Sequence, residues 1–212
     1  LAVMTVIVSF LSCSKNSSPS GPGNSNTALW PLKAGDTWVY ADSVFTDSLY
    51  ATSYPDTITA LSTTYNDPGG FPLFEITSSS GQGWFYNNSW VGVDPSNSTI
   101  YLMDTLGSGS YPFFFYPPYD NSLVGSGTDF SNPTCPVTLS QYGFLSTVTV
   151  NGFSCVRNIM YAIDCNNITQ EVVVIYVSPG NGVVRIEDYE LSSKNTLQPT
   201  YTQTLQSVKL AQ

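Results

Sequence analysis

Residues 145–163 read LSTVTVNGFSCVRNIMYAI, and this stretch decides the fold. Two runs rich in β-branched and aromatic residues, 145–150 and 153–163, flank the dipeptide Asn151-Gly152. A two-residue type I′ turn favours Asn-Gly because both of its positions need a positive φ. The stretch therefore predicts a β-hairpin.

The rest of the chain repeats this pattern of short strands separated by turns. No window shows the spacing of apolar residues that a helix requires, and 16 glycines and 14 prolines interrupt the chain at short intervals. We expect further strands at 37–45, 71–78, 83–93, 99–104, 168–177, 183–191 and 198–210. The predicted fold class is all-β: a single antiparallel meander domain of about eight to ten strands, forming a curved sheet, half-barrel or sandwich.

The N-terminal residues 1–11 (LAVMTVIVSFL) are almost wholly apolar and end at Ser12-Cys13. Such a run is too short to span a bilayer, for which about 20 residues are needed, but it suits the core of a secretory signal. A small residue before a cysteine resembles the lipobox of bacterial lipoproteins, in which the cysteine is acylated. We expect residues 1–13 to be a truncated lipoprotein signal peptide that ends at the lipidated Cys13. The alternative is a buried N-terminal strand that happens to contain a cysteine.

Ser, Asn, Gly and Pro fill nearly all of residues 14–27. This composition cannot bury enough apolar surface to fold, so we expect a disordered tether there and an all-β domain over residues 28–212. Several acyl chains on Cys13 would anchor the protein stably to a membrane, where a single chain binds only marginally. The expected location is the bacterial cell envelope, as an outer-membrane lipoprotein that faces the periplasm or the cell surface.

Charge excludes one class of partner. The chain has six basic and fifteen acidic residues, for a net charge of −9, and its only arginines are Arg157 and Arg185. Nucleic-acid binding depends on clustered Lys and Arg that displace counterions from phosphates. We therefore expect no nucleic-acid partner.

Three segments resemble a group of uncharacterised envelope lipoproteins of the Bacteroidetes type. These are residues 31–40 (PLKAGDTWVY), 148–156 (VTVNGFSCV) and 176–184 (YVSPGNGVV). The resemblance implies a curved antiparallel sheet, similar to the half-barrels of periplasmic lipoprotein carriers. It implies no activity, and an envelope protein or a glycan would be the partner.

The same segments have a structural interpretation. Trp38 and Tyr40 are two residues apart in a predicted strand, so both side chains fall on one face, and we expect that face to pack in the core. Gly180 and Gly182 are expected to supply positive φ angles in a tight turn.

Cysteine spacing predicts one disulfide and one free thiol. With Cys13 lipidated, Cys135, Cys155 and Cys165 remain in an oxidising compartment. Cys155 and Cys165 would lie about ten residues apart along one strand that rises ~3.3 Å per residue, which is beyond disulfide reach. Cys135 therefore pairs with one of the other two, and we favour Cys155. No metal site is expected, because the chain has no histidine and the cysteine spacings match no zinc motif.

The absence of histidine also excludes Ser-His-Asp and Cys-His catalysis. Carboxylates remain, and among Glu187, Asp188 and Glu190 only the last two share a strand face. A solvated strand face is the favoured interpretation, since a glycosidase needs two carboxyls about 5 to 10 Å apart across a cleft. No nucleotide-binding loop is present, so we expect neither a cofactor nor an enzymatic activity.

The most unusual stretch is residues 111–119 (YPFFFYPPY). Its three prolines exclude a central strand, because proline lacks the hydrogen-bond donor that a ladder needs, so we expect an edge strand or a loop. Folded inward, the stretch would close one end of the core, and exposed it would form a binding surface. The candidate ligand-binding residues are Trp84, Trp90, Phe113, Phe114, Phe115 and Tyr116.

These features favour a non-catalytic, membrane-anchored envelope lipoprotein with a structural or interaction role. The alternative is a carrier or binder of an apolar or carbohydrate ligand, held in an aromatic-lined groove. A carboxylate-based hydrolase is the least favoured class, since it requires two acidic groups that face one cleft.

Overall fold

The structure is a computed structural model, and it describes residues 29–46, 51–96, 98–106, 109–116, 119–129 and 132–211. Cys13 and the expected tether at 14–27 lie outside the described residues. The strands are β1 (Thr37–Phe45), β2 (Ala51–Asn66), β3 (Pro72–Ser78), β4 (Ser89–Asp94), β5 (Thr99–Met103), β6 (Tyr111–Phe115), β7 (Ser122–Asp129), β8 (Val137–Val150), β9 (Phe153–Ile163), β10 (Thr169–Ser178), β11 (Gly182–Leu191) and β12 (Leu197–Lys209).

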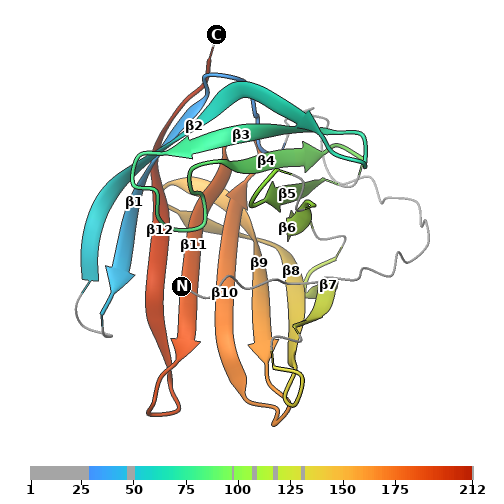
Figure 1. The fold of residues 1–212 in the computed structure, drawn as a ribbon. Helices are drawn as coiled ribbons and strands as arrows, with labels where there is room; N and C mark the ends of the chain where they lie inside the picture. The colour runs from blue at the N-terminus through green and yellow to red at the C-terminus, as the bar shows by residue number, and fades with distance from the viewer. Residues whose placement is uncertain are drawn as a thin grey trace.

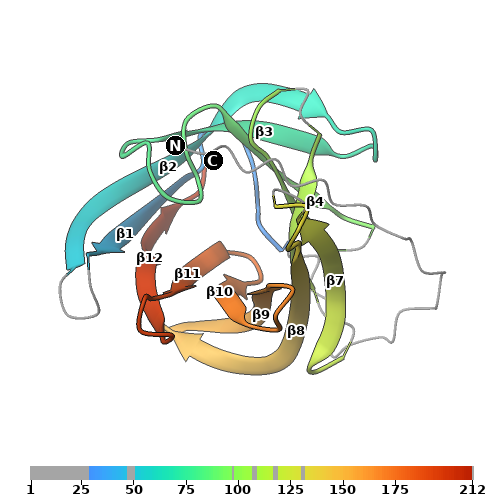
Figure 2. The same cartoon turned by 60° about the horizontal axis from the view of Figure 1, so that its bottom comes forward.

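All twelve strands belong to one antiparallel sheet, in the order β6-β5-β4-β3-β2-β1-β12-β11-β10-β9-β8-β7. The first and last strands pair with each other, so β6 and β7 form the two edges. The sheet curls around into a barrel that is nearly closed (Figures 1 and 2). The expected all-β meander is confirmed, as a single curved sheet and not a sandwich. Among the described residues, no helix is long and apolar enough to cross a membrane.

The predicted hairpin is present and joins the two long strands β8 and β9. Asn151 and Gly152 have φ angles of 48° and 83°, and Val150 pairs with Phe153 on either side of them. The turn between β10 and β11 also behaves as expected, with φ angles of 87° at Gly180 and 86° at Gly182.

Trp38 and Tyr40 point into the barrel and are fully buried, as their alternation predicts. Trp38 Nε1 donates a hydrogen bond to the Asn181 carbonyl at 3.0 Å, and the Tyr40 hydroxyl donates one to the Val183 carbonyl at 2.8 Å. Both polar tips are therefore paired inside the core, which ties β1 to the turn between β10 and β11.

One predicted strand is wrong in its first half. Residues 83–93 form a strand only from Ser89 onward, and the segment before it folds into the barrel, where Phe85 is fully buried. Phe85 packs against Phe113 of β6 at a centroid distance of 6.0 Å. The apolar run of this segment thus fills the core from a loop.

The edge strand β6 is joined to the opposite wall of the barrel by buried side-chain amides. Gln141 of β8 donates from Nε2 to the Phe113 carbonyl at 3.0 Å and to Asn158 Oδ1 at 2.9 Å. Gln141 and Asn158 are 7% and 0% exposed. These bonds tie the edge strand β6 to β8 and β9, with which it forms no strand ladder.

Candidate functional site

The aromatic residues singled out from the sequence lie in three places. Trp84 is half-buried against Phe113, with ring centroids 5.5 Å apart, and Phe114 is fully buried in the same core. Trp90 is 5% exposed and belongs to a second, smaller cluster with Leu73 and Met103. The structure therefore brings Trp84 and Phe113 together but places Trp90 elsewhere.

The prolines of residues 111–119 predicted an edge or a loop, and β6 is indeed an edge strand. Its phenylalanines fold inward, which is the alternative in which this stretch closes one end of the core. Phe115 is partly buried, with its ring next to Gly125. Tyr116, which follows the strand, is 41% exposed. A role for these residues in ligand binding stays a prediction.

The disulfide joins Cys135 to Cys165, and the favoured pair Cys135–Cys155 is wrong. Thr138 at the start of β8 pairs with Ile163 at the end of β9, so the two bonded cysteines meet at the same end of this strand pair. Cys155 lies near the other end of β9 and is buried as a free thiol whose pKa burial raises to about 11.

Counting residues outward along both strands from the Asn151-Gly152 turn would have predicted the Cys135–Cys165 disulfide. The two strands advance together away from the turn, apart from a register shift between Phe144 and Val148, so Cys165 lies opposite residues close to Cys135. Cys155, only three residues beyond the turn, must lie opposite Val148, far from Cys135.

The carboxylates of β11 divide between the two faces of the sheet. Glu187 faces outward and forms an ion pair with Arg185 at 2.7 Å. Asp188 pairs in register with the fully buried Val173 and lies on the concave face, near Glu171. The expectation of a solvated strand face is therefore wrong for Asp188. Burial, followed by the charges of Glu171 and Glu190, raises the pKa of Asp188 to about 7.

A second buried carboxylate lies on the concave face of β1. Asp42 is fully buried and accepts hydrogen bonds on Oδ2 from the Tyr201 hydroxyl at 2.8 Å and from Gln203 Nε2 at 3.3 Å. Burial raises the pKa of Asp42 to about 6, against the lowering effect of the Tyr201 hydrogen bond. Asp42 Oδ1 and Gln203 Oε1 have no hydrogen-bond partner. Within the described ranges, no group of three or more Cys, Asp or Glu side chains could hold a metal ion.

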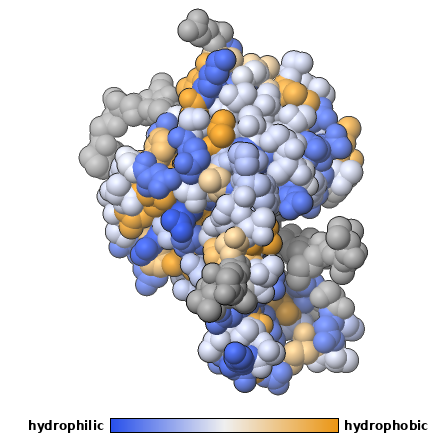
Figure 3. Space-filling model, turned by 90° about the vertical axis from the view of Figure 1, so that its left-hand side faces the viewer, coloured by the Kyte–Doolittle hydropathy of each residue, from blue (hydrophilic) through white to orange (hydrophobic). Residues whose placement is uncertain are grey.

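The outer surface on the side of β1 and β2 offers no continuous apolar patch. Figure 3 shows hydrophobic residues scattered singly there among hydrophilic ones. Single exposed apolar side chains are normal on a protein surface, so a binding site has to be sought in a concave feature.

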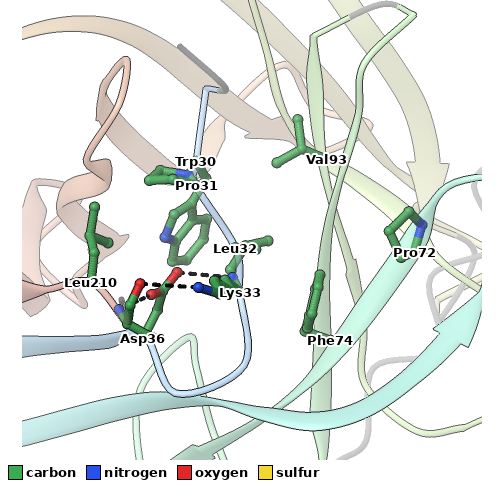
Figure 4. Close-up of a pocket in the computed structure, with 10 residues that line it drawn as sticks. Trp30, Pro31, Leu32, Lys33, Asp36, Pro72, Phe74, Val93 and Leu210 are labelled. Carbon is green, nitrogen blue, oxygen red and sulfur yellow. Dashed lines mark hydrogen bonds between the residues drawn. The ribbon is translucent and has the colours of Figure 1, made fainter. Parts of the chain in front are cut away.

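One concave feature among the described residues is a pocket of about 360 Å³, which we call the upper pocket (Figure 4). This volume falls in the range of small-molecule sites. Three elements that are far apart in the sequence meet there: the segment before β1, the strands β3 and β4, and the residues after β12. The lining residues are Trp30, Pro31, Leu32, Lys33, Asp36, Pro72, Phe74, Val93, Leu210 and Ala211.

Asp36 holds the two ends of the described chain together at this pocket. Its Oδ2 accepts a hydrogen bond from the Lys33 amide at 2.9 Å, and its Oδ1 accepts one from the Ala211 amide at 2.6 Å. The side chain is only 2% exposed. Asp36 thereby fixes the bend of residues 31–36 and seats the residues after β12 against it.

Trp30 closes the floor of the upper pocket toward the core. Its ring meets Trp38 edge-on at a centroid distance of 5.4 Å and lies directly over Gly182. A Cβ at Gly182 would overlap the indole ring, so this turn position requires glycine for space as well as for its φ angle. Two segments of the family resemblance, 31–40 and 176–184, thus meet at the pocket and its floor.

Sequence reasoning assigned these segments to packing and missed the pocket. Pro31, Leu32, Lys33 and Asp36 all belong to the segment PLKAGDTWVY. Their clustering before a strand was a signal in the sequence, but Phe74 and Val93 come from β3 and β4, which the curvature of the sheet brings to them.

No protein-family model matches this chain, and no curated protein is similar to it in sequence. Two solved structures are similar to it in fold. One, provisionally described as a lipoprotein, comes from Parabacteroides distasonis ATCC 8503 and is 14% identical, with a TM-score of 0.42 over 88% of this chain and 100% of that chain. The other, provisionally described as an exported protein with a YmcC-like fold, comes from Bacteroides fragilis NCTC 9343 and is also 14% identical, with a TM-score of 0.44 over 87% of this chain and 100% of that chain.

Proposed function

We propose that the protein is a non-catalytic, lipid-anchored protein of the bacterial envelope that acts by binding an apolar ligand in the upper pocket. The observation that carries the proposal is the pocket itself. Its volume of about 360 Å³ and its mostly apolar lining by Leu32, Phe74, Val93 and Leu210 are those of a small-ligand site.

The absence of a catalytic constellation supports a binding role over an enzymatic one. The chain contains no histidine, and the upper pocket contains one carboxylate, Asp36, whose two oxygens both accept backbone hydrogen bonds. A carboxylate used in this way holds the backbone and is a poor general base. The half-buried pair of Asp188 and Glu171 belongs to a different part of the barrel.

A fluorescent probe tests whether the pocket binds. N-phenyl-1-naphthylamine is neutral and apolar, and its emission rises when it leaves water. The purified chain carrying Cys13→Ser should bind this probe saturably. Leu210→Trp should weaken binding about tenfold by filling the pocket from a position that is 46% exposed, which spares the fold.

Leu197→Trp is the matched control, because Leu197 is 39% exposed at the other end of β12 and does not line the pocket. Val93→Trp fills the same pocket from another strand and should reproduce the effect of Leu210→Trp. Failure of the parent protein to bind the probe, or equal binding by all variants, would remove the upper pocket as the ligand site.

The anchor has its own test. Growth with an alkyne-labelled fatty acid should label the protein through Cys13 and leave it in the membrane fraction, whereas Cys13→Ala should be unlabelled and released. An intact upstream segment with an unmodified Cys13 in the mature protein, seen by mass spectrometry, would contradict the lipid anchor.

A further inference from the structure

The two charged side chains that line the upper pocket lie on the same side of it. Figure 4 shows Phe74 and Val93 on one side of the space, and Lys33 and Asp36, together with the apolar Leu210, on the opposite side. Leu32 lies between the two and points toward the apolar side (Figure 4). A ligand that fills the pocket along this direction needs an apolar body and a polar head.

The charges at the polar end decide the sign of that head. The Asp36 carboxylate is buried, and two backbone amides occupy its oxygens. Lys33 is exposed, and its ammonium donates to the Ala211 carbonyl at the long distance of 3.4 Å, which leaves donors free for a ligand. Lys33 is the only basic residue that lines the pocket. Its ammonium is the charged donor of the lining that can pair with an anionic head.

The position of the pocket relative to the expected anchor indicates where such a ligand would come from. Residues 14–28 separate Cys13 from Leu29, where the described structure begins at the pocket wall. A chain of this length spans at most ~50 Å when fully extended. A protein held by Cys13 would thus keep the upper pocket within about this distance of the bilayer, where single-chain lipids are concentrated.

We infer that the ligand of the upper pocket is a single-chain amphiphile with an anionic head, of the fatty-acid or lysolipid class. The hydrocarbon chain lies against Leu32, Phe74 and Val93, and the head pairs with the ammonium of Lys33. This inference rests on the proposed binding function and specifies the chemical class of its ligand.

Competition against N-phenyl-1-naphthylamine separates the head from the chain. Dodecanoate, dodecanol and dodecyltrimethylammonium carry the same chain with a negative, a neutral and a positive head. All are used below their micelle concentrations on the full chain carrying Cys13→Ser. We expect dodecanoate to displace the probe at a concentration about tenfold lower than dodecanol does, and the cationic compound to be the weakest.

Lys33→Gln should remove the preference for dodecanoate and leave competition by dodecanol within about twofold, because the apolar wall is unchanged. Lys209→Gln, an exposed lysine at the end of β12, is the matched control and should keep the preference. Competition by 1-lauroyl-lysophosphatidylglycerol is then compared with competition by dodecanoate. The compound that displaces the probe at the lower concentration shows whether a lysolipid or a fatty acid binds more tightly.

The outcomes keep this inference apart from the proposed function. Binding of the neutral probe with equal competition by dodecanoate and dodecanol would retain the pocket as a ligand site but overturn the anionic amphiphile. An equal loss of preference in Lys33→Gln and Lys209→Gln would also overturn the anionic amphiphile. Probe binding that vanishes when the protein concentration rises would overturn it as well, because a second copy of the chain would then occupy the pocket. Absence of probe binding would reject the proposed function itself.

Discussion

The side-chain amide of Asn158 pairs with both backbone polar groups of Phe115, as a neighbouring strand would. Asn158 Oδ1 accepts a hydrogen bond from the Phe115 amide at 2.9 Å, and its Nδ2 donates one to the Phe115 carbonyl at 3.0 Å. Asn158 belongs to β9, whereas Phe115 ends the edge strand β6. A single amide thus pairs both backbone polar groups of Phe115 at the edge of the sheet.

Replacement of Asn158 by alanine should destabilise the fold strongly. The substitution leaves the Phe115 amide and carbonyl without these partners and removes the acceptor of Gln141 Nε2, and all of these groups are buried or partly buried. We expect the free energy of unfolding in urea, followed by tryptophan fluorescence, to fall by about 3 kcal/mol. Asn166→Ala, at an exposed turn residue, should change it by less than about 0.5 kcal/mol. Equal effects of the two substitutions would show that the edge is held by other contacts.

Gly83 is required by space as well as by its backbone. Its φ angle is 79°, and an added Cβ would overlap the Tyr201 hydroxyl, which donates to the buried Asp42. Gly83→Ala should therefore lower the free energy of unfolding by about 3 kcal/mol, from backbone strain and overpacking together. The measurement is again urea unfolding.

Gly70→Ala separates the two causes. Gly70 has a φ angle of 87°, but an added Cβ would meet nothing within 4 Å, so this variant reports the backbone cost alone, about 1 kcal/mol. If Gly83→Ala lowered the free energy of unfolding no more than Gly70→Ala does, the Tyr201 hydroxyl would have moved aside without cost. The close packing at Gly83 would then not contribute to stability.

Local turn chemistry made part of this fold predictable. Asn151-Gly152 specified its hairpin because few dipeptides accept two positive φ angles, and the alternation of Trp38 and Tyr40 specified the buried face of β1. By contrast, β2 was missed because much of residues 51–66 is Ser and Thr with no sustained apolar alternation. The predicted strand over 83–88 is wrong because this segment is a loop that folds into the barrel and buries Phe85. The contacts that hold the loop there, such as the one with Phe113, come from residues distant in sequence, so the sequence pattern did not reveal them.

The candidate site was less predictable than the fold for the same reason. Lys33 and Asp36 stood out in a recognisable segment, yet their pocket exists only because the curvature of the sheet brings Phe74 of β3 and Val93 of β4 to them. The surroundings of the half-buried Asp188 also depend on strand register. Alternation with Ile186 predicts which face of the sheet Asp188 lies on, but only the pairing of β11 with β10 places Glu171 near it. A sequence pattern gives the face of a strand, and the tertiary fold decides what that face meets.

The disulfide predicts a clear difference among the cysteines. Loss of the Cys135–Cys165 bond by Cys135→Ser should lower the free energy of unfolding by about 3 to 4 kcal/mol, because the bond closes a loop between residues 30 apart in the sequence. Peptide mapping without reduction should recover Cys135 linked to Cys165. Cys155 should resist alkylation in the native protein, since it is fully buried and its thiol pKa is raised to about 11. A Cys155-linked peptide would contradict this assignment.

Stability should fall as the pH rises from about 4 to 7, which is opposite to the usual behaviour of carboxylates. Burial raises the pKa of Asp188 from its ordinary value of 3.8 to about 7 in the folded protein, and that of Asp42 to about 6. A raised pKa means that the folded state binds the proton more tightly than the unfolded state does. Stability is then greatest below the unfolded pKa and is lost as the pH passes through the folded one.

Asp188→Asn tests the larger of these two contributions. At pH 8 the parent protein must keep a charge on the half-buried Asp188 beside Glu171, whereas asparagine carries none, so the variant should be more stable by about 2 kcal/mol. This is roughly half of what the full shift would give to an isolated group, because the charge of Glu171 contributes to the raised pKa of Asp188 and the two carboxyls titrate as a pair. At pH 4 the two proteins should differ little. Asp120→Asn is the control: its pKa is lowered by the Ser146 amide, so it titrates below this range and should leave the slope unchanged. Parallel curves for Asp188→Asn and the parent protein between pH 5 and 8 would show that Asp188 is ionised and well solvated in the folded state.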